Sequence, residues 1–63
     1  MLPKDPFMLL SYVNTQLRDH YASLEDFAAG MGIDSEELKE KLAKLNYVYN
    51  DQLNKFIPVQ KDA

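Results

Sequence analysis

The residue pattern changes at Asn46 from a helical to an extended period, and this change constrains the fold more than any other feature. Before Asn46, apolar residues recur every three or four positions, which is the spacing of amphipathic helices. After it, residues 47–49 and 55–57 are rich in aromatic and β-branched side chains, and the polar residues 50–54 are typical of a turn. The pattern predicts helices followed by a β-hairpin. Because a lone hairpin is marginal in water, we expect it to pack on the helices.

Three helices precede the hairpin in this prediction, over about residues 6–20, 23–31 and 34–45. Each starts at a side chain that can accept hydrogen bonds from the free N–H groups of the first turn, and these caps are Asp5, Ser23 and Asp34. Glycine and asparagine tolerate the left-handed backbone that ends a helix. We therefore expect Gly30 and Gly32 to end the second helix and Asn46 to end the third.

The buried side chains of the helices follow from the same spacing. At about 100° per residue, the apolar residues of each helix form one face. On the first helix, Leu9 lies at the edge of this face. The expected core residues are Phe7, Leu10, Val13, Leu17 and Tyr21 on the first helix, Leu24, Phe27, Ala28 and Met31 on the second, and Leu38, Leu42 and Leu45 on the third.

The hairpin is expected over about residues 47–57, with residues 60–63 as a tail. If Asn50 faces Asn54 across the turn, Val48 lies beside Phe56 on one face of the hairpin. The order of helix, helix–glycine turn–helix and hairpin is that of a winged helix-turn-helix. We therefore predict one small α+β domain over residues 1–63, mainly helical, in which a helix-turn-helix-like bundle of three helices carries a C-terminal β-hairpin.

Composition excludes several classes of protein. The 63 residues are too few for a second domain, and no apolar run is long enough for a membrane span. The chain has no cysteine, so it can form neither disulfides nor thiolate metal sites. Its single histidine, His20, would need carboxylates as the remaining ligands of a zinc ion. Ten acidic and seven basic residues give a net charge of −3. We expect a soluble, acidic, cytoplasmic domain with no metal and no cofactor.

Several short motifs resemble the small bacterial proteins of the DUF 4250 family. The resemblance covers about residues 2–57, and its most specific part is the run of Asp-Pro, Asn and Leu-Arg-Asp. It implies a bacterial, cytoplasmic protein and no assigned activity, so no functional residue is carried over. Departures are Phe27-Ala28, where the family often has Leu-Cys, and Asn46-Tyr47, where it often has Gly-Tyr. The matching segments are Leu2-Pro3-Lys4-Asp5-Pro6, Leu9-Leu10-Ser11, Val13-Asn14, Leu17-Arg18-Asp19, Tyr21, Ser23-Leu24 and Tyr47-Val48-Tyr49-Asn50.

The chain offers no convincing set of catalytic residues. A nucleophile needs an adjacent base and a group that orients the base. Ser23 is already assigned as a helix cap, and Ser11 and His20 point to different sides of the first helix. There is no glycine-rich phosphate loop and no dinucleotide-binding motif. We expect no enzymatic activity and no small-molecule substrate.

Two groups on the first helix are candidates for interaction. Asn14 lies within the apolar face of this helix. A polar group buried there must be hydrogen-bonded, because leaving it without a partner costs about 1–3 kcal/mol of stability. Asn14 either bonds backbone groups of the hairpin or of the turn between helices two and three, or forms a recognition strip for a peptide or anion with Ser11 and Arg18. An apolar group of Met8, Leu9 and Tyr12 in the first two turns either covers the C-terminal tail or contacts a partner.

We therefore predict a non-catalytic interaction or regulatory module that binds protein, including a second copy of itself. The alternative is a DNA-binding winged-helix regulator. In that class the start of the third helix enters the major groove, and here it reads Asp34-Ser35-Glu36-Glu37. Three carboxylates in four residues, with a pI near 4.8, disfavour nucleic acid as the partner.

Overall fold

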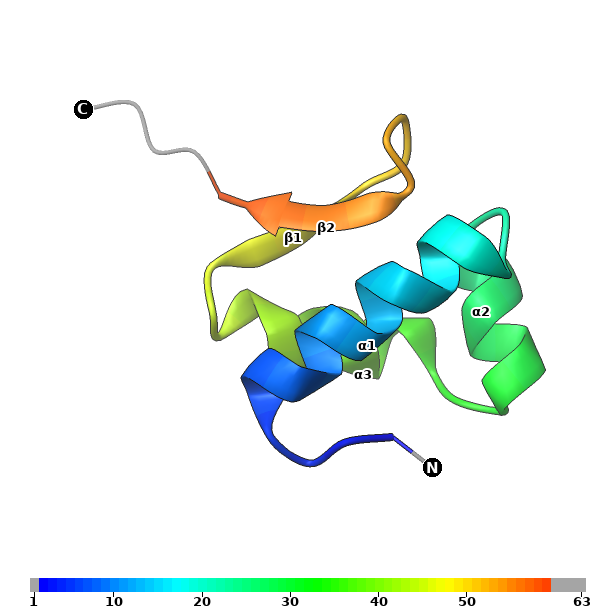
Figure 1. Ribbon diagram of the computed structural model, residues 1–63. Coiled ribbons are helices and arrows are strands. Elements are labelled where there is room, and N and C mark those ends of the chain that lie inside the picture. The colour runs from blue at the N-terminus through cyan, green and yellow to red at the C-terminus, as the bar shows by residue number, and fades with distance from the viewer. Residues whose placement is uncertain (1, 60–63) are drawn as a thin grey trace.

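Three helices are followed by a two-stranded antiparallel hairpin, in a computed structural model that describes residues 2–59. The hairpin lies across one side of the helices, with β2 beside α1 (Figure 1). The predicted α+β, mainly helical class with a C-terminal β-hairpin is confirmed. The predicted tail at residues 60–63 lies outside the described residues. The elements are α1 (Pro6–Asp19), α2 (Leu24–Met31), α3 (Ser35–Ala43), β1 (Tyr47–Asn50) and β2 (Lys55–Pro58).

The three predicted N-caps are confirmed. In each, a side-chain oxygen accepts a hydrogen bond from a backbone N–H of the first turn, which would otherwise have no partner. The three bonds run from Phe7 N to Asp5 Oδ1 (2.9 Å), from Asp26 N to Ser23 Oγ (3.1 Å) and from Glu36 N to Asp34 Oδ1 (2.9 Å).

The helix ends agree with the prediction at two positions and differ at a third. Gly32 ends α2 with φ of 68°, and Asn46 adopts the expected left-handed backbone with φ of 64°. The prediction that Gly30 also ends α2 is wrong, since it lies inside this helix. A Cβ on Gly30 would lie 2.8 Å from Cε1 of Tyr21, so this glycine makes room for the tyrosine ring. The helix α3 stops at Ala43 because tighter bonds with three-residue spacing take over its last turn.

The predicted hairpin register is wrong by one position. Asn50 pairs with Lys55, and Tyr49 rather than Val48 lies opposite Phe56. The cause is a four-residue loop over 51–54, in which Oδ1 of Asn50 accepts hydrogen bonds from Gln52 N (2.9 Å) and Leu53 N (3.0 Å). Asn54 belongs to this loop, and its positive φ of 54° turns the chain into β2. As a result Tyr49 and Phe56 pack together, with ring centroids 5.5 Å apart.

In the core, one side of every helix packs in a single cluster with Phe56 of the hairpin. The prediction that Phe7 belongs to the core is wrong, since 65% of it is exposed, while Leu9 lies in the core with 4% exposed rather than at its edge. The buried face of α1 is therefore rotated toward Leu9, and Leu2 of the preceding segment also packs against the core. The buried apolar residues are Leu9, Leu10, Val13, Leu17, Leu24, Phe27, Ala28, Leu38, Leu42 and Phe56.

Candidate functional site

One stripe of α1 faces a groove of about 780 Å³ between this helix and the hairpin. Phe7, Ser11, Asn14 and Arg18 follow one another at spacings of four, three and four residues, so they share one face of the helix. The three polar residues of the predicted recognition strip thus line one groove. The loop and β2 form its other wall, where Leu53 and Lys55 contribute their side chains.

Within this groove, Asn14 is bound to the backbone of the hairpin. Its Nδ2 donates to the carbonyl oxygen of Phe56 at 3.1 Å, and its Oδ1 accepts from Phe56 N at 2.8 Å. This matches the first of the two interpretations of Asn14, a bond to the hairpin backbone. Both ends of the carboxamide are engaged, so Asn14 positions the hairpin against α1 and forms the floor of the groove rather than a free recognition group.

Arg18 lies at the end of the stripe and bonds its neighbour in sequence. Its Nε and Nη2 donate to the two carboxylate oxygens of Asp19 at 2.8 and 2.9 Å. The hydrogen bond from Arg18 lowers the pKa of Asp19, and the same bond with Asp19 raises the pKa of Arg18. The Arg18 side chain is 74% exposed. Because Arg18 keeps remaining N–H donors accessible, it can also contact an anionic group in the groove.

Two large apolar side chains in the groove are open to solvent. Phe7 is 65% exposed and Leu53 59% exposed, and both line the groove. Neither was among the predicted interaction residues. Phe7 was assigned to the core, and Leu53 belongs to a segment that the sequence marks only as a turn. The available signal was a leucine among the polar residues of that turn.

The three residues of the predicted apolar group, Met8, Leu9 and Tyr12, differ in burial and do not form one surface. Leu9 lies in the core, and Tyr12 is half-buried with its ring edge toward Phe27, at 6.5 Å between centroids. Met8 remains 62% exposed but does not line the groove. Of these three residues, Met8 alone is largely open to solvent.

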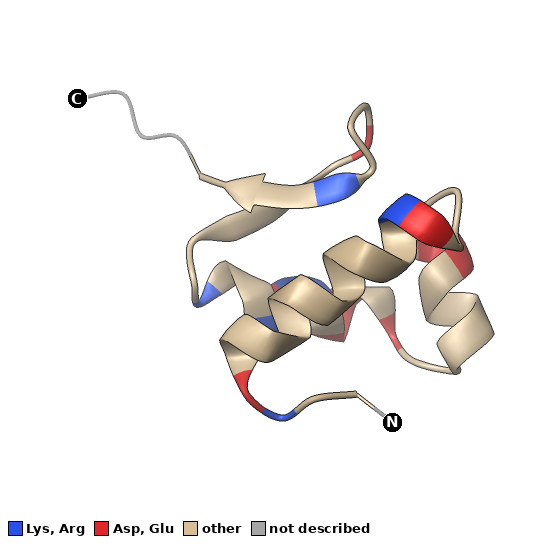
Figure 2. Cartoon of the chain, viewed as in Figure 1, with Lys and Arg blue, Asp and Glu red and all other residues tan. Residues whose placement is uncertain are grey.

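Charged side chains are absent from most of α1. Between Pro6 and Leu17 the helix carries none, and Figure 2 shows this stretch free of colour until Arg18 and Asp19 at its end. Cations stand at that end of the groove, where Arg18 and Lys55 both line it. The groove is therefore uncharged along most of α1, and where α1 ends it is lined by two cations, Arg18, which is paired with Asp19, and Lys55.

The remaining polar candidates are engaged in local structure. The Ser23 hydroxyl caps α2, and the Ser35 hydroxyl donates to Oε1 of Glu25 at 3.5 Å. Between residues 2 and 59, no group of three His, Cys, Asp or Glu side chains is placed to hold a metal ion. No helix in this part of the chain has the length and apolar character of a membrane span.

Comparison with known proteins identifies a family and no characterised relative. The family model described as "Domain of unknown function (DUF4250)" matches residues 3–56, most of the 63-residue chain. No curated protein and no solved structure matches the chain significantly. The chain belongs to the DUF4250 family, as its sequence motifs predicted.

Proposed function

We propose that this DUF4250 domain is a non-catalytic module that binds another protein in the groove between α1 and the hairpin. One observation carries the proposal: Phe7 and Leu53, two of the most exposed large apolar side chains, come from segments far apart in the sequence and line the same groove. Phe7 lies in the first turn of α1 and Leu53 in the loop that is tied to the other end of this helix, so the two side chains offer apolar contacts at both ends of the groove. Aromatic and aliphatic anchors in a groove are typical of a protein interface.

The charge pattern of α1 supports the same assignment. Cores of protein interfaces are depleted of charged residues and enriched in aromatic ones. The stretch from Pro6 to Leu17 has no charge, in a chain whose charged fraction is 27%. A helix face that served only to keep the domain in solution would carry some of that charge.

The partner is expected to combine an apolar segment with acidic side chains. Phe7 and Leu53 offer apolar contact, while Arg18 and Lys55 offer two cations at one end of the groove. Complementary charges raise the association rate and fix the orientation of docking. A second copy of the chain, with its ten acidic residues, meets the same description. The proposal includes a cytoplasmic location, because a chain without cysteine lacks the disulfides that commonly stabilise small secreted domains.

DNA binding is the alternative, and only the order of the elements favours it. The start of α3 carries Glu36 and Glu37 beside the cap Asp34. Carboxylates at this position would meet the phosphates of a duplex, and affinity for DNA depends mainly on cations. The charge of α3 therefore supports a protein partner over a nucleic acid.

The test is photocrosslinking in cells of the native host. A photocrosslinking amino acid replaces Phe7 or Leu53 in the groove, and in the control it replaces Met8, which is equally exposed on α1 but outside the groove. We expect positions 7 and 53 to crosslink to the same discrete protein and position 8 not to do so. Equal crosslinking at all three positions, or crosslinking to nucleic acid alone, would contradict the proposal. Sedimentation of the purified protein shows whether the partner is a second copy.

A further inference from the structure

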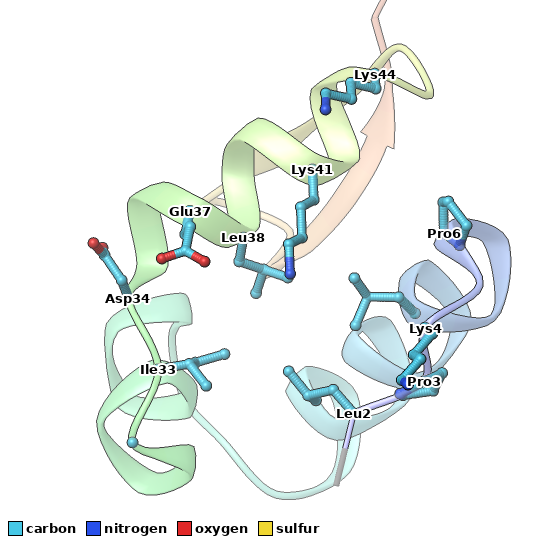
Figure 3. A pocket seen from close by; sticks show the side chains of 12 residues that line it. Leu2, Pro3, Lys4, Pro6, Ile33, Asp34, Glu37, Leu38, Lys41 and Lys44 are labelled. Carbon is cyan, nitrogen blue, oxygen red and sulfur yellow. The ribbon is translucent and has the colours of Figure 1, made fainter.

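A separate cavity of about 660 Å³ lies between the N-terminal segment and α3, and it shares no lining residue with the groove. Its inner wall is apolar. Leu9 and Leu38, with 4% and 3% exposed, form the floor, and the half-buried Leu2 and Ile33 form the sides. Figure 3 shows Leu2 and Ile33 facing each other across the cavity below α3.

Local backbone chemistry keeps this cavity open. Pro3 and Pro6 restrict the N-terminal segment, which runs beside the cavity and places Leu2 on the core. Opposite it, Gly32 turns the chain with φ of 68°, and the N–H of Ile33 bonds the carbonyl of Ala28 at 2.9 Å. Gly32 lines the cavity without a side chain, and a Cβ at this position would have no atom within 4 Å.

The charged side chains around the cavity are separated by sign. Asp34 and Glu37 stand at the start of α3, whereas Lys41 and Lys44 stand near its end (Figure 3). Lys41 extends from α3 toward the N-terminal segment, which carries Lys4. Three of the seven basic residues of this acidic chain thus gather around one apolar cavity.

The lysines at this cavity are available to a ligand. Among residues 2–59 the ion pairs are those of Arg18 with Asp19 and of Lys39 with Glu36, and neither includes a lysine of the cavity. Lys4, Lys41 and Lys44 are exposed, and no carboxylate of residues 2–59 lies within 4 Å of their ammonium groups. An anion that also had an apolar chain would gain contact with both parts of the cavity.

We propose that this cavity binds a medium-chain monocarboxylate. The hydrocarbon chain lies on Leu2, Ile33 and Leu38, and the carboxylate lies between Lys4 and Lys41. Asp34, at the start of α3, and Glu37, one turn before Lys41, repel a second carboxylate, so the site selects one negative charge over two. A cationic amphiphile of the same length meets the lysines, and a neutral one makes no use of them.

The test is a titration of the full-length protein with decanoate below its micelle-forming concentration, followed by amide chemical shifts and by calorimetry. We expect saturable shifts at Gly32, Ile33 and Leu38, and weaker binding of decanol and of decyltrimethylammonium. Lys41→Glu is expected to weaken decanoate binding by at least about tenfold, since it replaces an attraction by a repulsion. Lys39→Glu makes the same charge change on the same helix outside the cavity and is expected to leave the affinity unchanged.

The outcomes separate this proposal from its competitors. Decanol binding as tightly as decanoate, equal losses in the two lysine variants, or no saturable shift would overturn it. Tighter binding to anionic phospholipid vesicles than to free decanoate would also overturn it, in favour of a membrane surface. Circular dichroism confirms that each variant is folded, and Leu2→Ser gives a second test that leaves the lysines intact. Because Phe7 and Leu53 lie in the groove, failure here leaves the crosslinking result untouched.

Discussion

Asn14 and Phe56, 42 positions apart in the chain, are joined by two hydrogen bonds that close the outer edge of the hairpin. The bond from Val59 N to Asn46 O at 2.7 Å extends the ladder between the strands. Since hydrogen-bonded pairs alternate in an antiparallel ladder, the N–H and C=O of Phe56 point away from β1. The carboxamide of Asn14 takes the place of a neighbouring strand. Through these bonds α1 protects the edge of β2 at Phe56 from pairing with other chains. Pro58, further along the same strand, has no N–H to offer to another chain.

Replacing Asn14 is expected to destabilise the domain. Asn14→Ala leaves the part-buried N–H and C=O of Phe56 without partners, and each group loses a bond that water replaces only in part. We expect a loss of about 1–3 kcal/mol in the free energy of unfolding, measured by urea denaturation. Thr15→Ala serves as the control, since Thr15 is exposed and bonds only within α1. Equal stability of the two variants would show that Asn14 does not hold the hairpin.

Arg18→Ala is expected to change stability far less than Asn14→Ala, because the pair with Asp19 is open to solvent. The pKa of Asp19 is lowered in the folded protein by its hydrogen bond with Arg18. Whatever stability the pair contributes is thus present above the unfolded-state pKa of Asp19 and is lost as the pH falls through the folded-state pKa. Urea denaturation across the acidic range should show the small difference between wild type and variant disappearing. A difference that grows on acidification would be evidence against this role.

The core of α3 depends on Leu42, which has no exposed surface. Leu42→Ala removes buried hydrocarbon and leaves a cavity, so we expect a loss of about 2–5 kcal/mol. In a domain of 63 residues such a loss is a large part of the total stability. Leu45→Ala, at a half-buried position of the same apolar stripe, should cost less. An unchanged thermal midpoint for Leu42→Ala would mean that the buried face of α3 is assigned wrongly.

Gly30 offers a test of packing against helix propensity. Alanine is favoured over glycine inside a helix by about 1 kcal/mol. A Cβ at this position would nevertheless lie 2.8 Å from Cε1 of Tyr21, whose ring packs edge-on against Phe27 at 5.4 Å between centroids. We expect Gly30→Ala to lower the thermal midpoint. The same change in a Tyr21→Leu background should raise it, because the ring is then gone and only the propensity remains.

The helices could be predicted from the sequence because their signals are local. Each cap lies within three residues of the N–H that it satisfies, and the left-handed residues Gly32 and Asn46 act on the turn that contains them. The buried arc of α1 was predicted less well. Apolar residues surround much of this helix, so its periodicity does not decide between Phe7 and Leu9, and only the folded chain shows that Leu9 is buried and Phe7 is exposed.

The hairpin register and the groove depend on contacts that no local pattern contains. Nδ2 of Asn54 donates to the carbonyls of Leu17 and Tyr21, both at 3.0 Å, and this ties the loop to the end of α1. The same loop places Leu53 at the groove with Phe7. The sequence predicts that residues 50–54 form a turn. Which side chains of this turn face α1 is seen only in the folded chain.

We expect the isolated protein to show no sequence-specific binding to duplex DNA at physiological salt. The net charge is −3, and the first turn of α3, which would enter the major groove, carries Glu36 and Glu37. Carboxylates near phosphates raise the free energy of docking. The lysines that line the cavity beside α3 give at most a weak attraction, and such binding fades steeply as salt rises.

Selection from a random duplex library, followed by fluorescence anisotropy near physiological salt, tests this prediction. Recovery of an enriched motif that binds with submicromolar Kd would contradict it and favour a winged-helix regulator, whereas binding that is independent of sequence and lost with added salt would support it.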